Sequence, residues 1–133
     1  MSDMSQENKL VVMVVDDSVL VRQQVSRALN ASGFTTLLAV DGVDALEKLD
    51  TTSVVLIISD VNMPRMGGLE LLAALRERNA GVPVIMLTTE GQESLVAQAK
   101  KAGAVAWILK PFKPELLVQA VQKITALHTA GAR

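Results

Sequence analysis

VVMVVDD, residues 11–17, is a run of five apolar residues that ends directly in the acidic pair Asp16 and Asp17. A run this short is far below the roughly 18 residues that cross a bilayer. Its aliphatic side chains suit a strand of a parallel sheet that helices cover on both faces. The stretch therefore predicts a buried strand with two carboxylates at its carboxyl end.

Two later runs repeat this pattern of an apolar strand that ends in a charge. VVLIIS, residues 54–59, is followed by Asp60, and AWIL, residues 106–109, is followed by Lys110. Because parallel strands end at the same edge of a sheet, we expect three carboxylates and one ammonium to share a crevice there. Like charges at close range resist ionising together, and buried charges need partners. A divalent cation and a phosphoryl group are the ligands that fit these charges.

The rest of the chain alternates short aliphatic runs with longer segments of helical period, which is typical of βα units around a parallel sheet. The first, third and fourth of five such strands are almost purely apolar, which predicts that they are central. The expected strands are residues 10–15, 35–40, 54–59, 84–87 and 106–109. The predicted fold class is α/β, with a five-stranded parallel sheet and five helices in a three-layer sandwich.

Proline and glycine mark the limits of the expected helices. The last helix is predicted from about Pro114 to Leu127, since proline suits a first turn. Gly33, Gly81 and Gly103 each stand between a helical segment and the next strand. A left-handed C-terminal cap is commonly glycine, so these three positions are expected to end helices.

Length and composition favour one cytoplasmic domain. The 133 residues fit a single domain with one core, predicted to span residues 1–133 with residues 1–9 as a flexible extension. The opening MSDMSQENK lacks the basic start and apolar middle of a secretory signal, and the chain has no cysteine. The formal charge is −1 without a basic cluster, so nucleic acid is not an expected partner. We expect a monomer that does not insert into membranes.

The charged crevice suits phosphoryl transfer. Mg²⁺ takes one or two carboxylates and keeps several waters, so Asp17 and Asp60 are the better direct ligands. Asp16 would act through water or orient its neighbour, and the order of the two stays open; Mn²⁺ is an alternative ion. A carboxylate can be the nucleophile, while Lys110 and the hydroxyl of Thr88, at the end of the fourth strand, would hold phosphoryl oxygens. The residues therefore predict an aspartyl-phosphate site.

These motifs together resemble the response-regulator receiver domains of two-component signalling, and among them the CheY-like stand-alone chemotaxis regulators. VVDDS, SDVNMP, GLELL, LTTE, GA and KPF occur in that order, and the similarity runs from about Leu10 to Leu127. The resemblance implies a flavodoxin-like sheet of order 2-1-3-4-5. It also implies a cis peptide bond between Lys110 and Pro111.

The resemblance assigns a role to each residue of the crevice. Asp60 would be the phosphoacceptor, and the main-chain carbonyl of Asn62 would join the carboxylates as a metal ligand. The full metal set would be Asp16, Asp17, Asp60 and Asn62. Two further positions match the family's switch hydroxyl and its lysine, namely Thr88 and Lys110.

A second layer of the resemblance concerns how long the phosphoryl group lasts. Asn62, two residues after Asp60, and Glu90, two after Thr88, are the residue types that CheY-like proteins place beside the phosphoaspartate. They would influence the attacking water, and an auxiliary phosphatase would contact Glu90. The implied result is a short-lived phosphorylated state.

Two positions differ from the family pattern. Trp107 stands where CheY-like proteins have a rotating tyrosine; it has the bulk to move between an exposed and a packed rotamer but lacks the hydroxyl. Gly67, in MPRMGG, replaces a frequent acid and makes the loop after Asp60 less negative.

The resemblance also implies partners. A CheA-like sensor histidine kinase would donate the phosphoryl group, and self-phosphorylation and autodephosphorylation with Mg²⁺ would be intrinsic to an otherwise non-enzymatic protein. Movement of Thr88 would let Trp107 turn and repack the face of the fourth helix, fifth strand and fifth helix. That face would bind a flagellar motor switch component or another effector. Nearby lysines are Lys100, Lys101, Lys113 and Lys123.

Simpler structural roles exist for each residue taken singly. Asp16 and Asp17 could cap a helix, Thr88 likewise, and Lys110 could be surface charge. Trp107 fits packing as well as switching. The coincidence of the charged residues at three strand ends favours the phosphoryl site over separate structural roles.

The sequence also bears on rival functions of proteins with a similar fold. A flavin or nucleotide site needs a Gly/Ser/Thr-rich loop after the first strand, whereas Asp16 and Asp17 would repel phosphate there. A phosphatase of the haloacid dehalogenase type would show two acids spaced by one residue and a cap domain. A receiver that works as a phosphorelay shuttle or a phosphate sink stays open.

Overall fold

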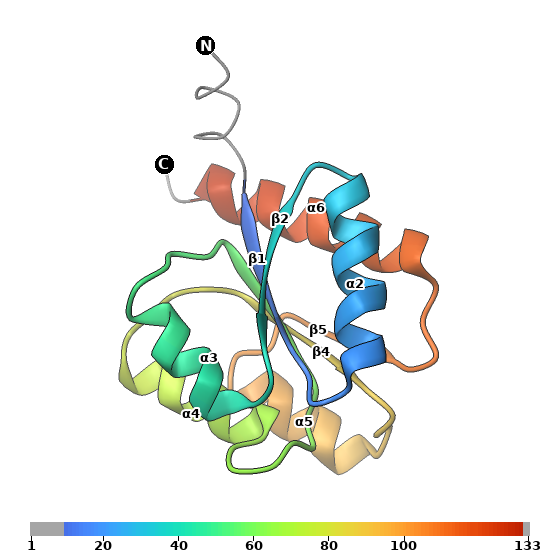
Figure 1. Cartoon of the computed structure of the whole chain (residues 1–133). Helices are drawn as coiled ribbons and strands as arrows, with labels where there is room; N and C mark the ends of the chain where they lie inside the picture. Colours follow the sequence, from blue (N-terminus) through green and yellow to red (C-terminus); the bar gives the residue numbers. More distant parts are fainter. Residues whose placement is uncertain (1–9, 132–133) are drawn as a thin grey trace.

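The computed structural model describes residues 10–131, with side chains as far as Leu127. Within that range, five parallel strands form one sheet of order β2-β1-β3-β4-β5, with helices on both faces (Figure 1). This matches the predicted fold class and strand order. The predicted flexible extension, residues 1–9, lies outside the described residues.

The elements alternate along the chain as the apolar pattern predicts. The strands are β1 (Val11–Val15), β2 (Thr35–Ala39), β3 (Leu56–Ser59), β4 (Val84–Thr88) and β5 (Ala106–Leu109). The helices are α2 (Val19–Ala31), α3 (Gly42–Leu49), α4 (Gly68–Glu77), α5 (Glu93–Lys101) and α6 (Pro114–Gly131).

The sheet separates two apolar layers. Alternate residues of each strand point to opposite faces, so Ile57 packs in one layer while Leu56 and Ile58 pack in the other. Helices α3, α4 and α5 cover the first face, and α2 and α6 cover the second (Figure 1). The prediction that the first, third and fourth strands are central is confirmed, because β2 and β5 form the edges.

Some element ends differ from the sequence predictions. The third strand begins at Leu56 rather than residue 54, although the Val55 amide already donates to the Val11 carbonyl (2.8 Å). The fourth strand continues through Thr88, so its last side chain reaches the carboxyl edge of the sheet. The last helix runs past residue 127 to Gly131.

Glycine closes two helices as predicted, but asparagine closes a third. Gly33 and Gly103 follow α2 and α5 with φ of 96° and 106°. After α4, the first left-handed residue is Asn79 (φ 56°), and the Ala80 amide donates to the Leu75 carbonyl (3.0 Å). Gly81 is left-handed too (φ 69°), but it lies two residues beyond Asn79, so the prediction that it caps α4 is wrong. Asparagine adopts the left-handed conformation more readily than most residues, which explains why Asn79 can take the place of glycine at this cap.

Among the described residues, no helix has the length and apolar composition needed to span a membrane.

Candidate functional site

Strand β1 delivers Asp16 and Asp17 to the carboxyl edge of the sheet in different environments. The Asp16 amide donates to the Ala39 carbonyl of β2 (3.1 Å), and its side chain is buried. Its Oδ1 accepts from the Ser18 amide (2.9 Å), and Ser18 in turn caps α2. Asp17 is exposed. Asp16 is thus held by the protein, whereas the Asp17 carboxylate faces solvent.

Lys110 joins two of the carboxylates. Its Nζ lies 2.8 Å from Oδ2 of Asp16 and 3.0 Å from Oδ2 of Asp60. Its amide donates to the Thr88 carbonyl (2.8 Å), and the Lys110–Pro111 bond is cis, as the resemblance implied. The end of β5 therefore delivers a positive charge between the ends of β1 and β3.

These contacts alter the titration of the lysine. Burial disfavours the charged ammonium, but the hydrogen bonds to Asp16 and Asp60 outweigh it, and the pKa of Lys110 is raised. The lysine therefore remains protonated at neutral pH.

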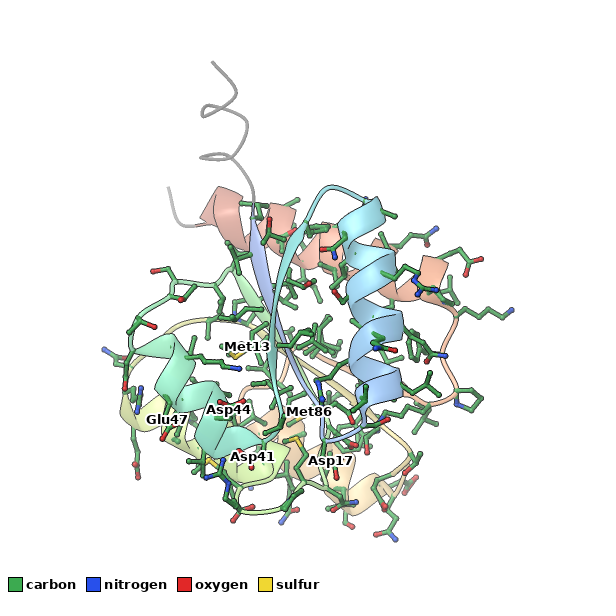
Figure 2. The ribbon with its side chains drawn as sticks, viewed as in Figure 1. Met13, Asp17, Asp41, Asp44, Glu47 and Met86 are labelled. Carbon is green, nitrogen blue, oxygen red and sulfur yellow. The ribbon has the colours of Figure 1, made fainter. Side chains whose placement is uncertain are left out.

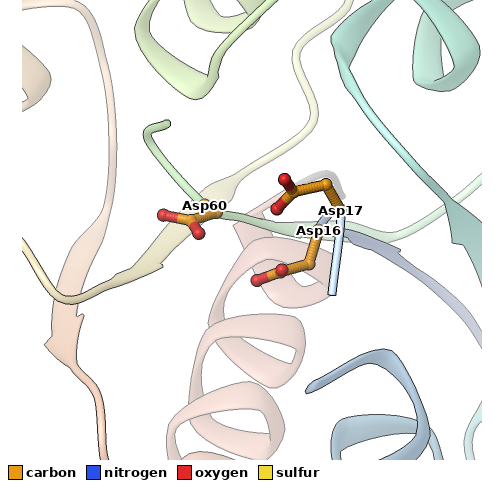
Figure 3. A group of neighbouring side chains, drawn as sticks. All are labelled: Asp16, Asp17 and Asp60. Carbon is orange, nitrogen blue, oxygen red and sulfur yellow. The ribbon is translucent and has the colours of Figure 1, made fainter. Parts of the chain in front are cut away.

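The three carboxylates gather as the sequence predicted. Oxygens of Asp16, Asp17 and Asp60 lie within 4.8 Å of one another and face a common space (Figure 3). Hard oxygen donors of this kind suit Mg²⁺, which needs few protein ligands and retains water. The donor set of three carboxylates thus fits Mg²⁺. On the other side, Oδ1 of Asp60 accepts from the Val61 amide (2.6 Å).

Asn62 and Glu90 lie together beside Asp60. The Asn62 side chain donates from Nδ2 to Oε2 of Glu90 (3.1 Å), across 28 positions in the sequence. The Glu90 amide donates to Oγ1 of Thr88 (3.2 Å), whose side chain is fully buried. A continuous polar chain therefore runs from the end of β4 to the residue two positions after Asp60.

Trp107 adds a contact that the sequence analysis missed. Its indole Nε1 donates to the main-chain carbonyl of Glu90 (2.8 Å), and its ring packs on the layer beneath α5. Although tryptophan lacks the tyrosine hydroxyl, its indole N–H is also a hydrogen-bond donor. Trp107 is therefore hydrogen-bonded to the loop that follows Thr88.

Two arginines near the site were also missed. Arg22 donates from Nη1 to the Asp16 carbonyl (2.6 Å), and Arg65 pairs with Asp41 (2.8 Å). Arg22 lies on α2, one turn after the Ser18 cap, and an N-cap signal at Ser18 would have placed it near the acidic pair. No local signal pairs Arg65 with Asp41, because 24 positions separate them.

Comparison with known proteins settles the family. The model of the response regulator receiver domain matches residues 12–122. The chain belongs to the response-regulator receiver family. This receiver is 38% identical over 117 residues to the chemotaxis protein CheY1 of Helicobacter pylori, which covers 85% of this chain and 94% of that protein.

Two further comparisons agree. The receiver is 32% identical to the chemotaxis protein CheY of Listeria monocytogenes, covering 86% of this chain and 97% of that protein. It also superposes on chemotaxis protein CheY4 of Vibrio cholerae, crystallised at low pH, with a TM-score of 0.82 and 40% identity. That alignment covers 86% of this chain and 98% of the solved chain.

Proposed function

We propose that this receiver accepts a phosphoryl group on Asp60 from a sensor histidine kinase and acts as a cytoplasmic chemotaxis regulator. The observation that carries the proposal is the Lys110 ammonium held between Asp16 and Asp60 in a group of three carboxylates. The similarity to chemotaxis proteins supports a role in chemotaxis, and the arrangement of the site supports phosphorylation of Asp60.

The chemistry follows from the groups around Asp60. A carboxylate oxygen of Asp60 attacks the phosphorus of a phosphohistidine, the P–N bond breaks, and the imidazole leaves with that electron pair. Lys110, already 3.0 Å from Oδ2, neutralises charge on the phosphoryl oxygens. Small phosphodonors such as acetyl phosphate would react in the same way, which makes self-phosphorylation intrinsic to the domain.

Asp16, Asp17, Asp60 and the main-chain carbonyl of Asn62 would hold Mg²⁺, or Mn²⁺ in its place. When bound, the ion supplies positive charge to the phosphoryl oxygens. Asp17 is exposed and would be free to reach the ion directly, whereas Asp16 is already bonded to Ser18 and Lys110. This favours the role of Asp16 through water or through orientation.

Loss of the phosphoryl group involves the Asn62–Glu90 pair. Hydrolysis requires a water to attack the phosphorus opposite the Asp60 oxygen, so that the P–O bond to the carboxylate breaks. The side chains of Asn62 and Glu90, 3.1 Å apart, stand beside this approach and would set the lifetime. An auxiliary phosphatase would act at Glu90.

The signal would leave through the face of α5, β5 and α6. Thr88 would move toward the phosphoryl oxygens and give up its contact with the Glu90 amide. Trp107, bonded to the Glu90 carbonyl, would respond to that movement. A flagellar motor switch component is the proposed partner on this face.

Two measurements test the proposal. Incubation with Mg²⁺ and acetyl phosphate should add one phosphoryl group by mass spectrometry to the wild type and none to Asp60→Asn. Binding to a purified motor switch component should strengthen with beryllofluoride, a phosphoryl mimic, only in the wild type. Equal binding by all forms would contradict the chemotaxis output, and transfer of label to a second histidine domain would instead identify a phosphorelay shuttle.

A further inference from the structure

The loop after Asp60, residues 61–67, is held against helix α3 by an ion pair. Arg65 donates from Nε to Oδ2 of Asp41 (2.8 Å) and from Nη2 to Oδ1 (3.1 Å). A guanidinium that bonds both oxygens of a carboxylate fixes direction as well as distance. Asp41 is buried and also caps α3 through the Asp44 amide (2.9 Å). Figure 2 shows Asp41 at the same end of the sheet as Asp17.

A second contact joins the same two segments. The Gly42 amide donates to the Met66 carbonyl (2.9 Å). A Cβ atom at position 42 would lie 2.6 Å from Cγ of Met66, so only glycine allows this approach without a shift. The loop therefore packs directly against the first turn of α3.

The loop has a shape that needs external support. Arg65 has φ of 66°, a left-handed conformation that residues other than glycine seldom adopt unless the surroundings hold them. The loop closes through the Gly68 amide, which donates to the Val61 carbonyl (2.9 Å). A Cβ atom at Gly67 would collide with that same carbonyl oxygen, so only glycine fits this turn of the loop. Gly67 therefore determines the shape of the loop and, in place of an acid, also makes it less negative.

The other end of the loop carries groups that face the site. The Val61 amide holds Oδ1 of Asp60 (2.6 Å), and the Asn62 side chain bonds to Glu90 (3.1 Å). The proposed function adds the Asn62 carbonyl as a metal ligand. Any loosening of the loop at Arg65 would therefore change the position of a metal ligand three residues away.

We propose that Arg65 is a positioning residue whose ion pair with Asp41 keeps loop 61–67 in the shape required for metal binding beside Asp60. Among the described residues, the hydrogen bonds of Arg65 go only to Asp41, so it acts through the loop. The metal-binding part of this inference rests on the proposed function, whereas the order of the loop does not.

The test compares Arg65→Ala with the wild type in two assays. Calorimetric titration measures Mg²⁺ affinity, and hydrogen–deuterium exchange with mass spectrometry measures the order of residues 61–67. Residues that orient metal ligands from outside the ligand set commonly change affinity by about 10–100-fold. Since Arg65 acts one step further away, we expect Mg²⁺ affinity to fall about three- to tenfold. Exchange should rise in residues 61–67 and stay unchanged in β1 and β4.

Matched variants separate positioning from general stability. Arg78→Ala removes a second arginine–aspartate pair among the described residues, with Asp50 (2.9 Å), and should leave Mg²⁺ affinity unchanged. Asp41→Asn keeps a cap oxygen for α3 but removes the charge, so it should resemble Arg65→Ala. Arg65→Lys keeps the charge without the double contact and should be intermediate. If Arg65→Ala does not melt cooperatively, the Mg²⁺ affinity and loop exchange of Asp41→Asn and Arg65→Lys decide whether the inference holds.

Phosphorylation by acetyl phosphate provides a further readout. Arg65→Ala should be slow at low Mg²⁺ and approach the wild-type rate at saturating Mg²⁺, because added metal offsets the weaker site. If Arg65→Ala bound Mg²⁺ as tightly as the wild type and showed the same exchange in residues 61–67, the inference would be overturned. A wild type that binds no Mg²⁺ would instead overturn the proposed function, while the exchange result would still report on the loop.

Discussion

At the scale of single residues, Lys110 is the group on which the charge balance of the site depends. Its ammonium contacts Asp16 and Asp60, whose side chains are only 3% and 14% exposed. The ammonium therefore places a positive charge directly between these two carboxylates. A divalent ion bound by these carboxylates would therefore share its ligands with Lys110.

Replacement of this lysine should therefore separate stability from metal binding. Lys110→Met removes the ammonium that donates to the Oδ2 atoms of both carboxylates and should lower the free energy of unfolding by about 1–3 kcal/mol. Mg²⁺ should then raise the melting temperature of the variant more than that of the wild type, because the competing ammonium is gone. Thermal melts with and without Mg²⁺ measure both effects. Lys113→Met, at an exposed lysine, is the control, and an equal Mg²⁺ shift in all three proteins would contradict the prediction.

Trp107 is the chain's only tryptophan, so the tryptophan fluorescence of the protein reports on this one residue. In this structure its indole is bonded to the Glu90 carbonyl, next to the residue expected to move on phosphorylation. Beryllofluoride with Mg²⁺ should change the fluorescence intensity of the wild type and its quenching by iodide. Asp60→Asn should show neither change. A wild-type spectrum that stays constant while phosphorylation proceeds would exclude Trp107 from the switch.

The residues of the site were predictable to different degrees. Asp16, Asp17, Asp60 and Lys110 could be placed together because apolar runs reveal strands and a parallel sheet aligns their ends. The indole contact of Trp107 could not, since it depends on the path of the loop after Thr88. The structure gives positions for these residues, and their roles remain predictions.

At the scale of elements, helix α4 (Gly68–Glu77) follows the loop after Asp60 and packs against the sheet. The helix buries Leu71, Leu72 and Leu75 against the sheet and ends at a left-handed asparagine. The apolar period predicted the helix, while its C-terminal cap was assigned to Gly81 because glycine is the commoner residue there. Local propensity alone does not rank Asn79 above a glycine two positions later.

Asn79 can be tested directly. Asn79→Gly should preserve or slightly increase stability, because glycine adopts φ of 56° without a Cβ clash. Asn79→Ala should lower the free energy of unfolding by about 1 kcal/mol, since a left-handed alanine is strained. Urea denaturation of both variants measures the difference. A larger loss for glycine than for alanine would show that the Asn79 side chain, rather than its backbone, stabilises the end of α4.

At the scale of the whole molecule, pH should act on stability through the link between α3 and the loop after Asp60. The hydrogen bond from Arg65 is the main cause that lowers the pKa of Asp41, and it outweighs burial, which would raise it. A carboxyl group whose pKa is lower in the folded state stabilises the protein above its unfolded pKa of about 3.9. That contribution disappears as the pH falls through the folded pKa.

Asp41→Asn isolates this contribution, because asparagine does not titrate and still offers an oxygen to the cap. The wild type should be more stable than Asp41→Asn at pH 6, and the difference should shrink below about pH 4. Urea denaturation at a series of pH values measures it. A difference that stays constant down to pH 3 would mean that the ion pair adds nothing through titration.

The Lys110 contact also bears on how a new copy of the protein comes into being. Small zinc domains stay unfolded until the ion arrives, because their ligands have no other partner. Here an ammonium from the end of β5 already occupies the place of a counterion between β1 and β3. A freshly translated chain can therefore complete its sheet before it meets any divalent ion, so we expect its folding, unlike the proposed phosphorylation of Asp60, to be independent of the metal supply.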